Sequence, residues 1–273
     1  MRFCLMFLAT SLMAQQRVVS LAPSATEMLY AMGWGDRVVG VTIYCHYPPQ
    51  VRQKAQVGSY LKPSLEAMAA LKPDLIISDP TTTKASLPGV AMAAIERRDL
   101  VSVERSAQNI AKAMGDPARA QALIERMRRD LEAVRKRNQG RARRKAMFVV
   151  GRNPGQLTGL VVVGRDSYLN ELIELAGGQN IFADAPVSYP KISTEDILAR
   201  QPDVIIDMGD MADTDAVPAG HLAKVRALYG KLPQVAAVKS GRVFAVASDI
   251  YVVPGPRVVD AAREFERMIQ GHK

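Results

Sequence analysis

One fifteen-residue pattern occurs twice in the chain, as PSLEAMAALKPDLII at residues 63–77 and as ISTEDILARQPDVII at residues 192–206. In each copy a serine opens a short helix, apolar residues follow at helical spacing, and Pro-Asp ends the helix. The apolar run after Pro-Asp predicts a buried strand. The repeat therefore predicts two similar α/β units in one chain.

A weaker repeat lies upstream of each copy. The segment EMLYAMG at residues 27–33 resembles ELIELAG at residues 171–177, and both lead toward a short apolar strand. Alternating strand and helix patterns are typical of parallel sheets built from βαβ units. The expected strands of the first unit are Val18–Leu21, Val38–Val41, Leu75–Ser78 and Leu100–Val103. Those of the second are Ala146–Val150, Val161–Val163, Val204–Asp207 and Val243–Ala247.

A long helix is predicted between the two units. Asp116 is a helix N-cap residue, and Pro117 suits the first helical position. Apolar residues then recur at helical intervals as far as Gly140. A helix over residues 116–140 would be ~36 Å long at the usual rise per residue. We therefore expect an α/β fold with two Rossmann-like lobes, residues 17–115 and 141–273, whose parallel sheets are joined by this rigid helix.

The first residues resemble a secretory signal. Arg2 precedes an apolar run from Phe3 to Leu12, and Ala14 suits a cleavage site. We therefore expect residues 1–14 to be a signal peptide and the mature protein to be periplasmic. Cleavage would leave Cys45 as the sole cysteine, so no internal disulfide is expected.

The formal net charge of +9 raises the question of nucleic acid binding. Much of the excess lies between Arg126 and Lys145, where no aromatic residue is available to stack on bases. A solvated helix face explains this charge better, and we expect no nucleic acid partner.

An ordered series of motifs resembles the helical-backbone solute-binding proteins of ABC importers, and most closely the cobalamin-binding members. The series comprises RVVSLAPSATE at residues 17–27, GVT at 40–42, YPP at 47–49, LKPDLI at 71–76, GGQNIF at 177–182, residues 193–202, Ser248-Asp249, and Pro256-Arg257. The resemblance implies two lobes, a rigid helix, a ligand between the lobes, and no catalysis or resident cofactor. It also implies a monomer that delivers its ligand to a membrane permease dimer.

Two glutamates are candidates for docking on that permease. Glu66 and Glu195 each lie seven residues before the proline of their repeat, so they occupy equivalent positions in the two lobes. The resemblance implies that one surface glutamate per lobe contacts arginines of the permease. Charges at a fixed separation also orient two partners and speed their encounter. A first-turn acidic residue that only complements a helix dipole is the alternative.

Six residues are candidate ligand contacts. A tyrosine offers a flat apolar face and a hydroxyl, which suits a large planar ring with polar edges. The four tyrosines beside turn residues are Tyr47, Tyr60, Tyr189 and Tyr251. Asp249 matches an aspartate of the resembling family and could accept hydrogen bonds from corrin amides. Arg257 is expected to open the last helix, where it faces either the ligand or nearby backbone.

The ligand expected from the resemblance is cobalamin, and two alternatives stay open. The first keeps the fold and changes the ligand to haem or a ferric siderophore. His46 or Tyr60 could make one axial contact to the metal of cobalamin or haem. The second is a periplasmic α/β enzyme that uses Cys45. Against an enzyme, the chain has no Gly-x-Gly-x-x-Gly after its first strand and no Gly-x-Ser-x-Gly.

Overall fold

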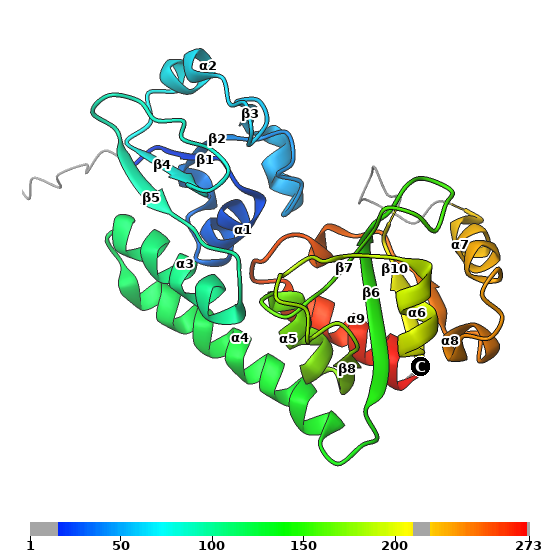
Figure 1. The fold of residues 1–273 in the computed structure, drawn as a ribbon. Helices are drawn as coiled ribbons and strands as arrows, with labels where there is room; N and C mark the ends of the chain where they lie inside the picture. The colour runs from blue at the N-terminus through cyan, green and yellow to red at the C-terminus, as the bar shows by residue number, and fades with distance from the viewer. Residues whose placement is uncertain (1–15, 210–218, 272–273) are drawn as a thin grey trace, which may run out of the picture.

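Two separate sheets, each flanked by helices, are joined by one long helix in the computed structural model (Figure 1). The structure describes residues 16–209 and 219–271, so the expected signal peptide at residues 1–14 lies outside the described residues. The arrangement confirms the predicted α/β class with two lobes. We use "N-terminal lobe" for residues 17–115, around the first sheet, and "C-terminal lobe" for residues 141–271, around the second.

The sheet of the N-terminal lobe is parallel throughout and has the order β3-β2-β1-β4-β5. Its strands are β1 (Val18–Ser20), β2 (Val38–Val41), β3 (Ala55–Gln56), β4 (Leu75–Ser78) and β5 (Ala91–Ala94). The helices between them are α1 (Pro23–Ala31), η1 (Gly35–Arg37), η2 (Pro49–Gln53) and α2 (Leu65–Ala70). Strands β2 and β3 are added on one side of β1, and β4 and β5 on the other, so the strand order reverses at β1. Ligands of such sheets bind at this point, beyond the carboxyl ends of the strands.

Both copies of the fifteen-residue repeat fold as the sequence predicts. Ser64 caps α2 by accepting a hydrogen bond from the Ala67 amide at 3.1 Å. Ser193 caps α6 (Thr194–Arg200) in the same way, and Pro-Asp then leads into a fully buried strand in each copy. Serine is favoured at this position because its hydroxyl satisfies an amide that the first helical turn leaves without a partner.

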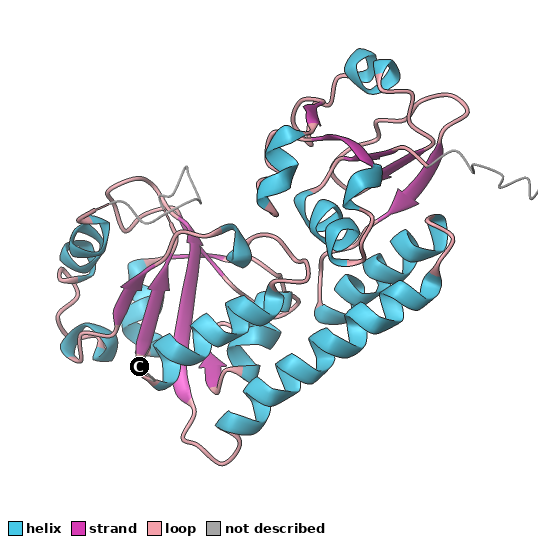
Figure 2. Ribbon diagram, turned by 180° about the vertical axis from the view of Figure 1, so that it is seen from behind, coloured by secondary structure: helices cyan, strands magenta, loops and turns pink. Residues whose placement is uncertain are grey.

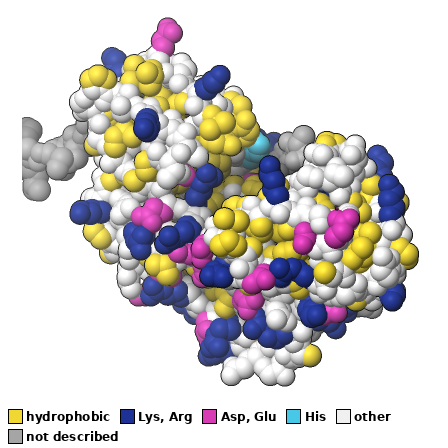
Figure 3. All heavy atoms as spheres, viewed as in Figure 1, with side chains coloured by type: hydrophobic (Ala, Val, Ile, Leu, Met, Phe, Trp, Pro, Cys, Tyr) yellow, Lys and Arg dark blue, Asp and Glu magenta, His cyan; other side chains and the backbone are white. Residues whose placement is uncertain are grey.

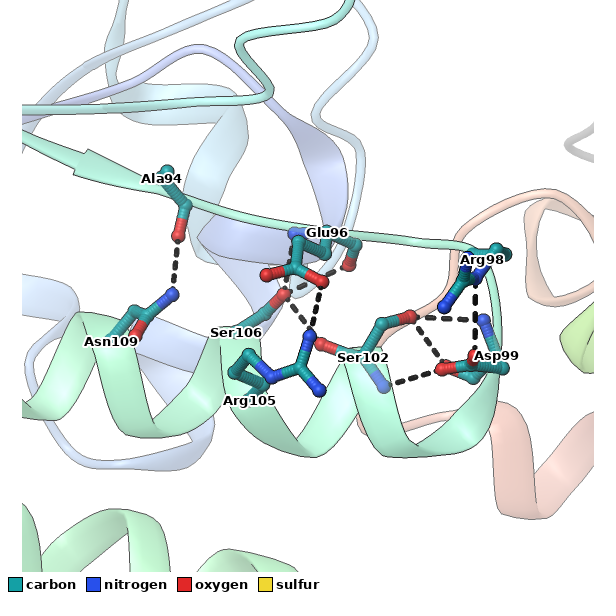
Figure 4. Close-up of polar contacts among 8 residues, drawn as sticks. All are labelled: Ala94, Glu96, Arg98, Asp99, Ser102, Arg105, Ser106 and Asn109. Carbon is teal, nitrogen blue, oxygen red and sulfur yellow. Dashed lines mark hydrogen bonds and ion pairs between the residues drawn. The ribbon is translucent and has the colours of Figure 1, made fainter.

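The predicted strand at Leu100–Val103 is wrong, because these residues begin α3 (Leu100–Ala113). Asp99 and Ser102 form a capping box in which each side chain accepts a hydrogen bond from the backbone amide of the other residue (Figure 4). The strand that completes the sheet is instead the alanine-rich β5. Figure 4 shows Asn109 of α3 bonded to Ala94 at the end of β5, and Ser106 bonded to Glu96 in the segment that follows.

The six-stranded sheet of the C-terminal lobe is only partly parallel. Its order is β11-β10-β6-β7-β9, and β8 also pairs with β6. The strands are β6 (Arg144–Gly151), β7 (Leu160–Val162), β8 (Gly178–Asn180), β9 (Lys191–Ile192), β10 (Val204–Asp207) and β11 (Val243–Ala245). Strand β7 runs antiparallel to both β6 and β9, which differs from the wholly parallel sheet expected. The remaining helices are α5 (Tyr168–Leu175), α7 (His221–Tyr229), α8 (Ala236–Lys239), η3 (Asp249–Tyr251) and α9 (Val258–Gln270).

The connecting helix α4 spans Pro117–Asn138 and runs along both lobes (Figure 2). It packs against α3 in the N-terminal lobe and against α5 and α9 in the C-terminal lobe. The apolar positions recognised from the sequence are all buried, namely Leu123, Ile124, Met127, Leu131 and Val134. Asp116 occupies the N-cap position but makes no side-chain cap, since its Oδ2 accepts from Arg119 Nε at 3.1 Å. Burial of one continuous helical stripe in both lobes makes α4 a firm connection.

Further contacts join the lobes beside α4. The carboxylate of Glu171 on α5 accepts a hydrogen bond from the Leu100 amide at 3.0 Å. The Tyr168 amide donates to the Arg98 carbonyl at 2.7 Å. Within the described residues, no helix is both long and apolar enough to cross a membrane.

Candidate functional site: a pocket between the lobes

A cavity of about 530 Å³ opens between the two lobes, beyond the carboxyl ends of β1, β2, β4 and β5. Figure 3 shows the molecular surface hollowed between the two lobes, with hydrophobic side chains on both sides. The volume falls within the range of small-molecule sites. The lining residues, which we call the interlobe pocket, are Leu21, Ala22, Pro23, Ser24, Ile43, Tyr44, His46, Tyr60, Asp79, Thr82, Ile95, Arg97, Asp249, Val252, Val253 and Pro254.

One wall of the interlobe pocket is aromatic. The rings of Tyr44 and Tyr60 lie 5.1 Å apart between centroids at an interplanar angle of 56°. His46 lines the same wall, and its Nε2 lies 3.0 Å from the Ile43 carbonyl oxygen. These side chains come from the loops after β2 and β3, and together they form an apolar surface edged by hydroxyl and imidazole groups. Such a surface suits a flat ring with polar substituents.

A buried acidic side chain stands on the opposite part of the N-terminal lobe's wall. Asp79 follows β4, and its Oδ1 accepts from the amide and the hydroxyl of Thr81 at 2.8 and 2.6 Å. Its Oδ2 lies 2.8 Å from Nε of Arg97, which is 49% exposed. This pairing of Asp79 with Arg97 leaves the wall with balanced charge rather than a strong excess of either sign.

Arg257 links the lobes at the base of the pocket. Its Nε donates to Oε2 of Glu27 at 3.0 Å, and its Nη2 also contacts Oε1 of Glu27. The guanidinium donates to both carboxylate oxygens of Asp249 at 2.7 and 2.8 Å. Tyr47 covers the guanidinium, with 4.1 Å between the ring centroid and Cζ. We call Glu27, Asp249 and Arg257 the interlobe clasp.

Glu27 of the clasp is almost fully buried on α1. Loss of hydration raises its pKa from 4.5 to about 7, and the hydrogen bond and charge of Arg257 oppose this rise. A raised value is physically reasonable here because one guanidinium serves two carboxylates, so the cluster carries an excess negative charge. Apart from the motif at residues 17–27, no sequence pattern indicated a role for Glu27.

The structure separates the predicted ligand contacts into three groups. Tyr60 and Asp249 line the interlobe pocket, and Tyr47 and Arg257 lie next to it, packed on each other. Tyr189 is half-exposed in the C-terminal lobe, where its hydroxyl accepts from Ser167 at 3.2 Å, and it is not part of the lining.

Tyr251 is placed in the core rather than on the pocket wall, contrary to expectation. Its side chain is 3% exposed and packs on Phe148 and Phe265, with ring centroids 5.6 and 5.4 Å away. The 3-10 helix η3 turns this ring inward, and its neighbours Val252 and Val253 line the pocket instead.

Cys45 is buried below the aromatic wall. Its Sγ lies 3.3 Å from the hydroxyl oxygens of both Thr26 and Thr42, and burial raises the pKa of the thiol. The adjacent His46 turns toward the Ile43 carbonyl and the pocket. Among the described residues, no group of three or more His, Cys, Asp or Glu side chains is arranged to hold a metal ion.

Glu66 and Glu195 occupy matching sites outside the pocket. Each lies in the first turn of its helix, α2 or α6, two residues after the capping serine, and each side chain is exposed. Their equivalence in the two lobes follows from the repeat and is preserved in the structure.

Tyr44, Asp79 and Arg97 are among the pocket residues that were not singled out from the sequence. Asp79 directly follows a predicted strand and Tyr44 lies three residues after another, which places them at the carboxyl edge where ligands of such sheets bind. That signal was available for both residues. Arg97 follows β5, and its place could not be recognised while the next segment was read as the strand.

Comparison with known proteins agrees with this architecture. A family model described as periplasmic binding protein matches residues 18–250. The vitamin B12-binding protein of Pectobacterium carotovorum subsp. carotovorum (strain PC1) is 30% identical over 258 residues, covering 92% of this chain and 87% of that protein.

Two solved structures are similar along almost their entire length. The periplasmic vitamin B12 binding protein of Vibrio cholerae has a TM-score of 0.74 and 26% identity, with 93% of this chain and 96% of that chain covered. The periplasmic heme-binding protein of Roseiflexus sp. RS-1 in apo form has a TM-score of 0.73 and 26% identity, with coverage of 94% and 100%. The family match, the two-lobed fold and the pocket at the strand ends agree, and the chain belongs to the periplasmic binding protein family.

Proposed function

We propose that this protein captures cobalamin or a related corrinoid in the interlobe pocket and delivers it to the permease dimer of an ABC importer. The observation that carries the proposal is the pocket itself, which lies between two lobes and presents paired tyrosines beside charge-balanced carboxylates. Its position at the strand ends fits a ligand site. The similarity to vitamin B12-binding relatives supports the corrinoid.

The charge of the pocket bears on the choice of ligand. Asp79 is paired with Arg97, and Asp249 shares Arg257 with Glu27, so these groups carry no excess of positive charge. A strongly anionic ferric siderophore would require an excess of basic groups, whereas a corrin ring edged by amides requires hydrogen-bonding groups of both kinds. The pocket therefore favours the corrinoid over the siderophore.

Haem is the second candidate. The observation that favours it is the cluster of His46, Tyr44 and Tyr60 on one wall, since imidazole and phenolate groups are ligands of haem iron. The solved heme-binding protein from Roseiflexus has the same fold. A haem complex would be recognised by a shift of the visible absorption band that His46→Ala or Tyr60→Phe removes.

Titration of the purified protein with cyanocobalamin, haemin and a ferric siderophore tests the proposal. Calorimetry should give a dissociation constant for cyanocobalamin tighter than roughly 10 μM, equivalent to about −7 kcal/mol. Tyr60→Ala should weaken this binding, whereas Tyr189→Ala, outside the lining, serves as the matched control. Failure to bind cyanocobalamin, combined with tight binding of haemin, would exclude the corrinoid and retain the transport role.

Delivery to the permease is assigned to Glu66 and Glu195. Both are exposed carboxylates at equivalent places in the two lobes, as docking onto a two-fold partner requires. This assignment does not depend on the identity of the ligand.

A further inference from the structure

Arg97 is the one arginine among the described residues that line the interlobe pocket, and its ion-pair partner there is a single carboxylate. A guanidinium carries five N–H donors, and two of its edges can each engage an anion. The closest contact of Arg97 is from Nε to Oδ2 of Asp79 at 2.8 Å. Within residues 16–209 and 219–271, no hydrogen bond joins its Nη1 or Nη2 to a protein acceptor, and half of the side chain is exposed at the pocket.

Asp79 forms an ion pair with this guanidinium and is itself held in place. The Asp79 side chain is 6% exposed, and the amide and hydroxyl of Thr81 hold its Oδ1. Arg97 follows β5, which pairs with β4, so the two residues extend from neighbouring strands. A cation held in this way loses little side-chain freedom when a ligand binds, which favours affinity.

Arg257 provides a comparison, because its guanidinium is bonded to carboxylates on two edges. It engages Glu27 with one edge and Asp249 with another, and it is thereby enclosed between two carboxylates. Arg97 has one carboxylate partner, Asp79, and its half-exposed side chain lines the pocket. The two arginines thus differ in one respect: Arg257 has a second carboxylate partner, and Arg97 has none among the described residues.

We propose that Arg97 is the specificity-determining residue of the interlobe pocket and binds an anionic oxygen group at the periphery of the ligand, the phosphodiester of a corrinoid's nucleotide loop. This inference rests on the proposed capture of a corrinoid. The start of α1 adds a weaker attraction in the same direction, because Ala22 and Pro23 line the pocket and Ala22 makes no side-chain cap.

The same chemistry has a second source. A phosphodiester and a carboxylate both offer paired oxygens that an arginine edge can bind in bidentate fashion. Haem carries carboxylates on its propionate groups and therefore presents the alternative. Pairs of ligands that differ only in the anionic group separate the two sources.

The experiment is a calorimetric cycle with two proteins and two corrinoids. Cyanocobalamin carries the phosphodiester, and dicyanocobinamide lacks the nucleotide loop that contains it. Arg97→Gln should weaken cyanocobalamin binding about 10-fold or more, because charged hydrogen bonds are lost. The affinity of Arg97→Gln for dicyanocobinamide should stay within about 2-fold of that of the unchanged protein. The effect of the substitution on the first ligand, less its effect on the second, is then the coupling between Arg97 and the phosphodiester.

Arg98→Gln is the matched control. Arg98 neighbours Arg97 in sequence, is 71% exposed, and pairs with Asp99 instead of lining the pocket (Figure 4). This variant should bind both corrinoids like the unchanged protein. Arg97→Lys keeps a cation beside Asp79 and should retain part of the preference for cyanocobalamin, which guards against a loss of folding in Arg97→Gln.

Equal weakening of both corrinoids by Arg97→Gln, or of neither, would overturn the inference while leaving corrinoid capture intact. If the unchanged protein binds no corrinoid, the proposed ligand is wrong, and haemin and haemin dimethyl ester decide the role of Arg97. A loss confined to haemin then supports an anion site that binds a carboxylate. Equal effects on the two haems, or no binding of any of the four compounds, overturns it.

Discussion

Nε of Arg257 in the C-terminal lobe donates to Oε2 of Glu27 in the N-terminal lobe at 3.0 Å, across 230 positions of sequence. A second contact crosses the lobes with the roles exchanged. Here the acceptor carboxylate, Glu171, lies in the C-terminal lobe, and the donor is the Leu100 amide of the N-terminal lobe. Glu27 and Glu171 open the two copies of the weaker repeat. One internal repeat has therefore produced a contact across the lobes from each side.

Arg257→Met should destabilise the protein by about 3–5 kcal/mol, since it leaves the buried carboxylate of Glu27 and the partly buried carboxylate of Asp249 without their shared cation. Urea unfolding followed by circular dichroism measures this change. Adding Glu27→Gln to Arg257→Met should restore part of the loss, because it removes one of the uncompensated charges. A double variant no more stable than Arg257→Met would show that the clasp contributes by packing alone.

The pH dependence of stability should reveal Glu27. Burial raises its pKa from 4.5 to about 7, so its protonated form is favoured in the folded state. The resulting stabilisation is complete below about pH 4.5 and is lost as the pH rises through about 7. The displacement corresponds to about 3 kcal/mol at most.

Unfolding free energies of the unchanged protein and Glu27→Gln between pH 5 and 8 isolate this effect, because the other titrating groups are common to both. The glutamine variant should gain stability relative to the unchanged protein as the pH rises. A difference that stays constant over this range would mean that Glu27 does not titrate there.

Tyr251 should behave as a core residue. Tyr251→Ala removes a ring packed on Phe148 and Phe265 and should cost about 3–5 kcal/mol of unfolding free energy. Tyr251→Phe keeps the ring and should change both stability and ligand affinity little. Calorimetric titration of the phenylalanine variant checks the second expectation, and a large loss of affinity would return Tyr251 to the ligand site.

Cys45 should react slowly with thiol reagents in the native protein. The side chain is 5% exposed, and burial raises the pKa of its thiol, so the reactive thiolate is scarce. Mass spectrometry after maleimide treatment should show labelling in denaturant only. Cys45→Ser should keep ligand binding and delivery, whereas loss of a turnover activity in this variant would favour the enzyme alternative.

Glu66→Ala combined with Glu195→Ala should leave ligand affinity unchanged and lower uptake by at least several-fold, because both docking charges are removed. Transport into vesicles or cells that contain the permease measures this effect. Glu125→Ala on α4 is the matched control, since Glu125 is also an exposed helical glutamate. Unchanged uptake in the double variant would leave the two glutamates with the alternative role of complementing the helix dipoles.

Local patterns in the sequence predicted most of the elements, and long-range contacts account for the errors. Ser64 and Ser193 act as caps, and the strands after Pro-Asp are buried, because these features depend on neighbouring residues. Strand β5 was missed since alanines favour helices, and only pairing with β4 makes them a strand.

The site shows the same limit. Tyr60 and Asp249 could be predicted from turns and from the motif in which they lie, and both line the pocket. The binding of Arg257 by Glu27 and Asp249 could not be predicted, because it depends on how the two sheets are oriented relative to each other. The Tyr251 side chain points into the core because of η3, and no local pattern in the sequence predicted this 3-10 helix.

The chain crosses between the lobes at α4, so each described sheet is encoded by a separate stretch of sequence. Every described strand of the first sheet precedes α4, and every described strand of the second follows it. Each half of the ligand site is therefore encoded by one uninterrupted stretch, and a chimera joined within α4 would exchange one half of the site at a time. The condition for such an exchange is electrostatic: a foreign first half must supply a carboxylate at the place of Glu27, or Arg257 would lose half of its counter-charge.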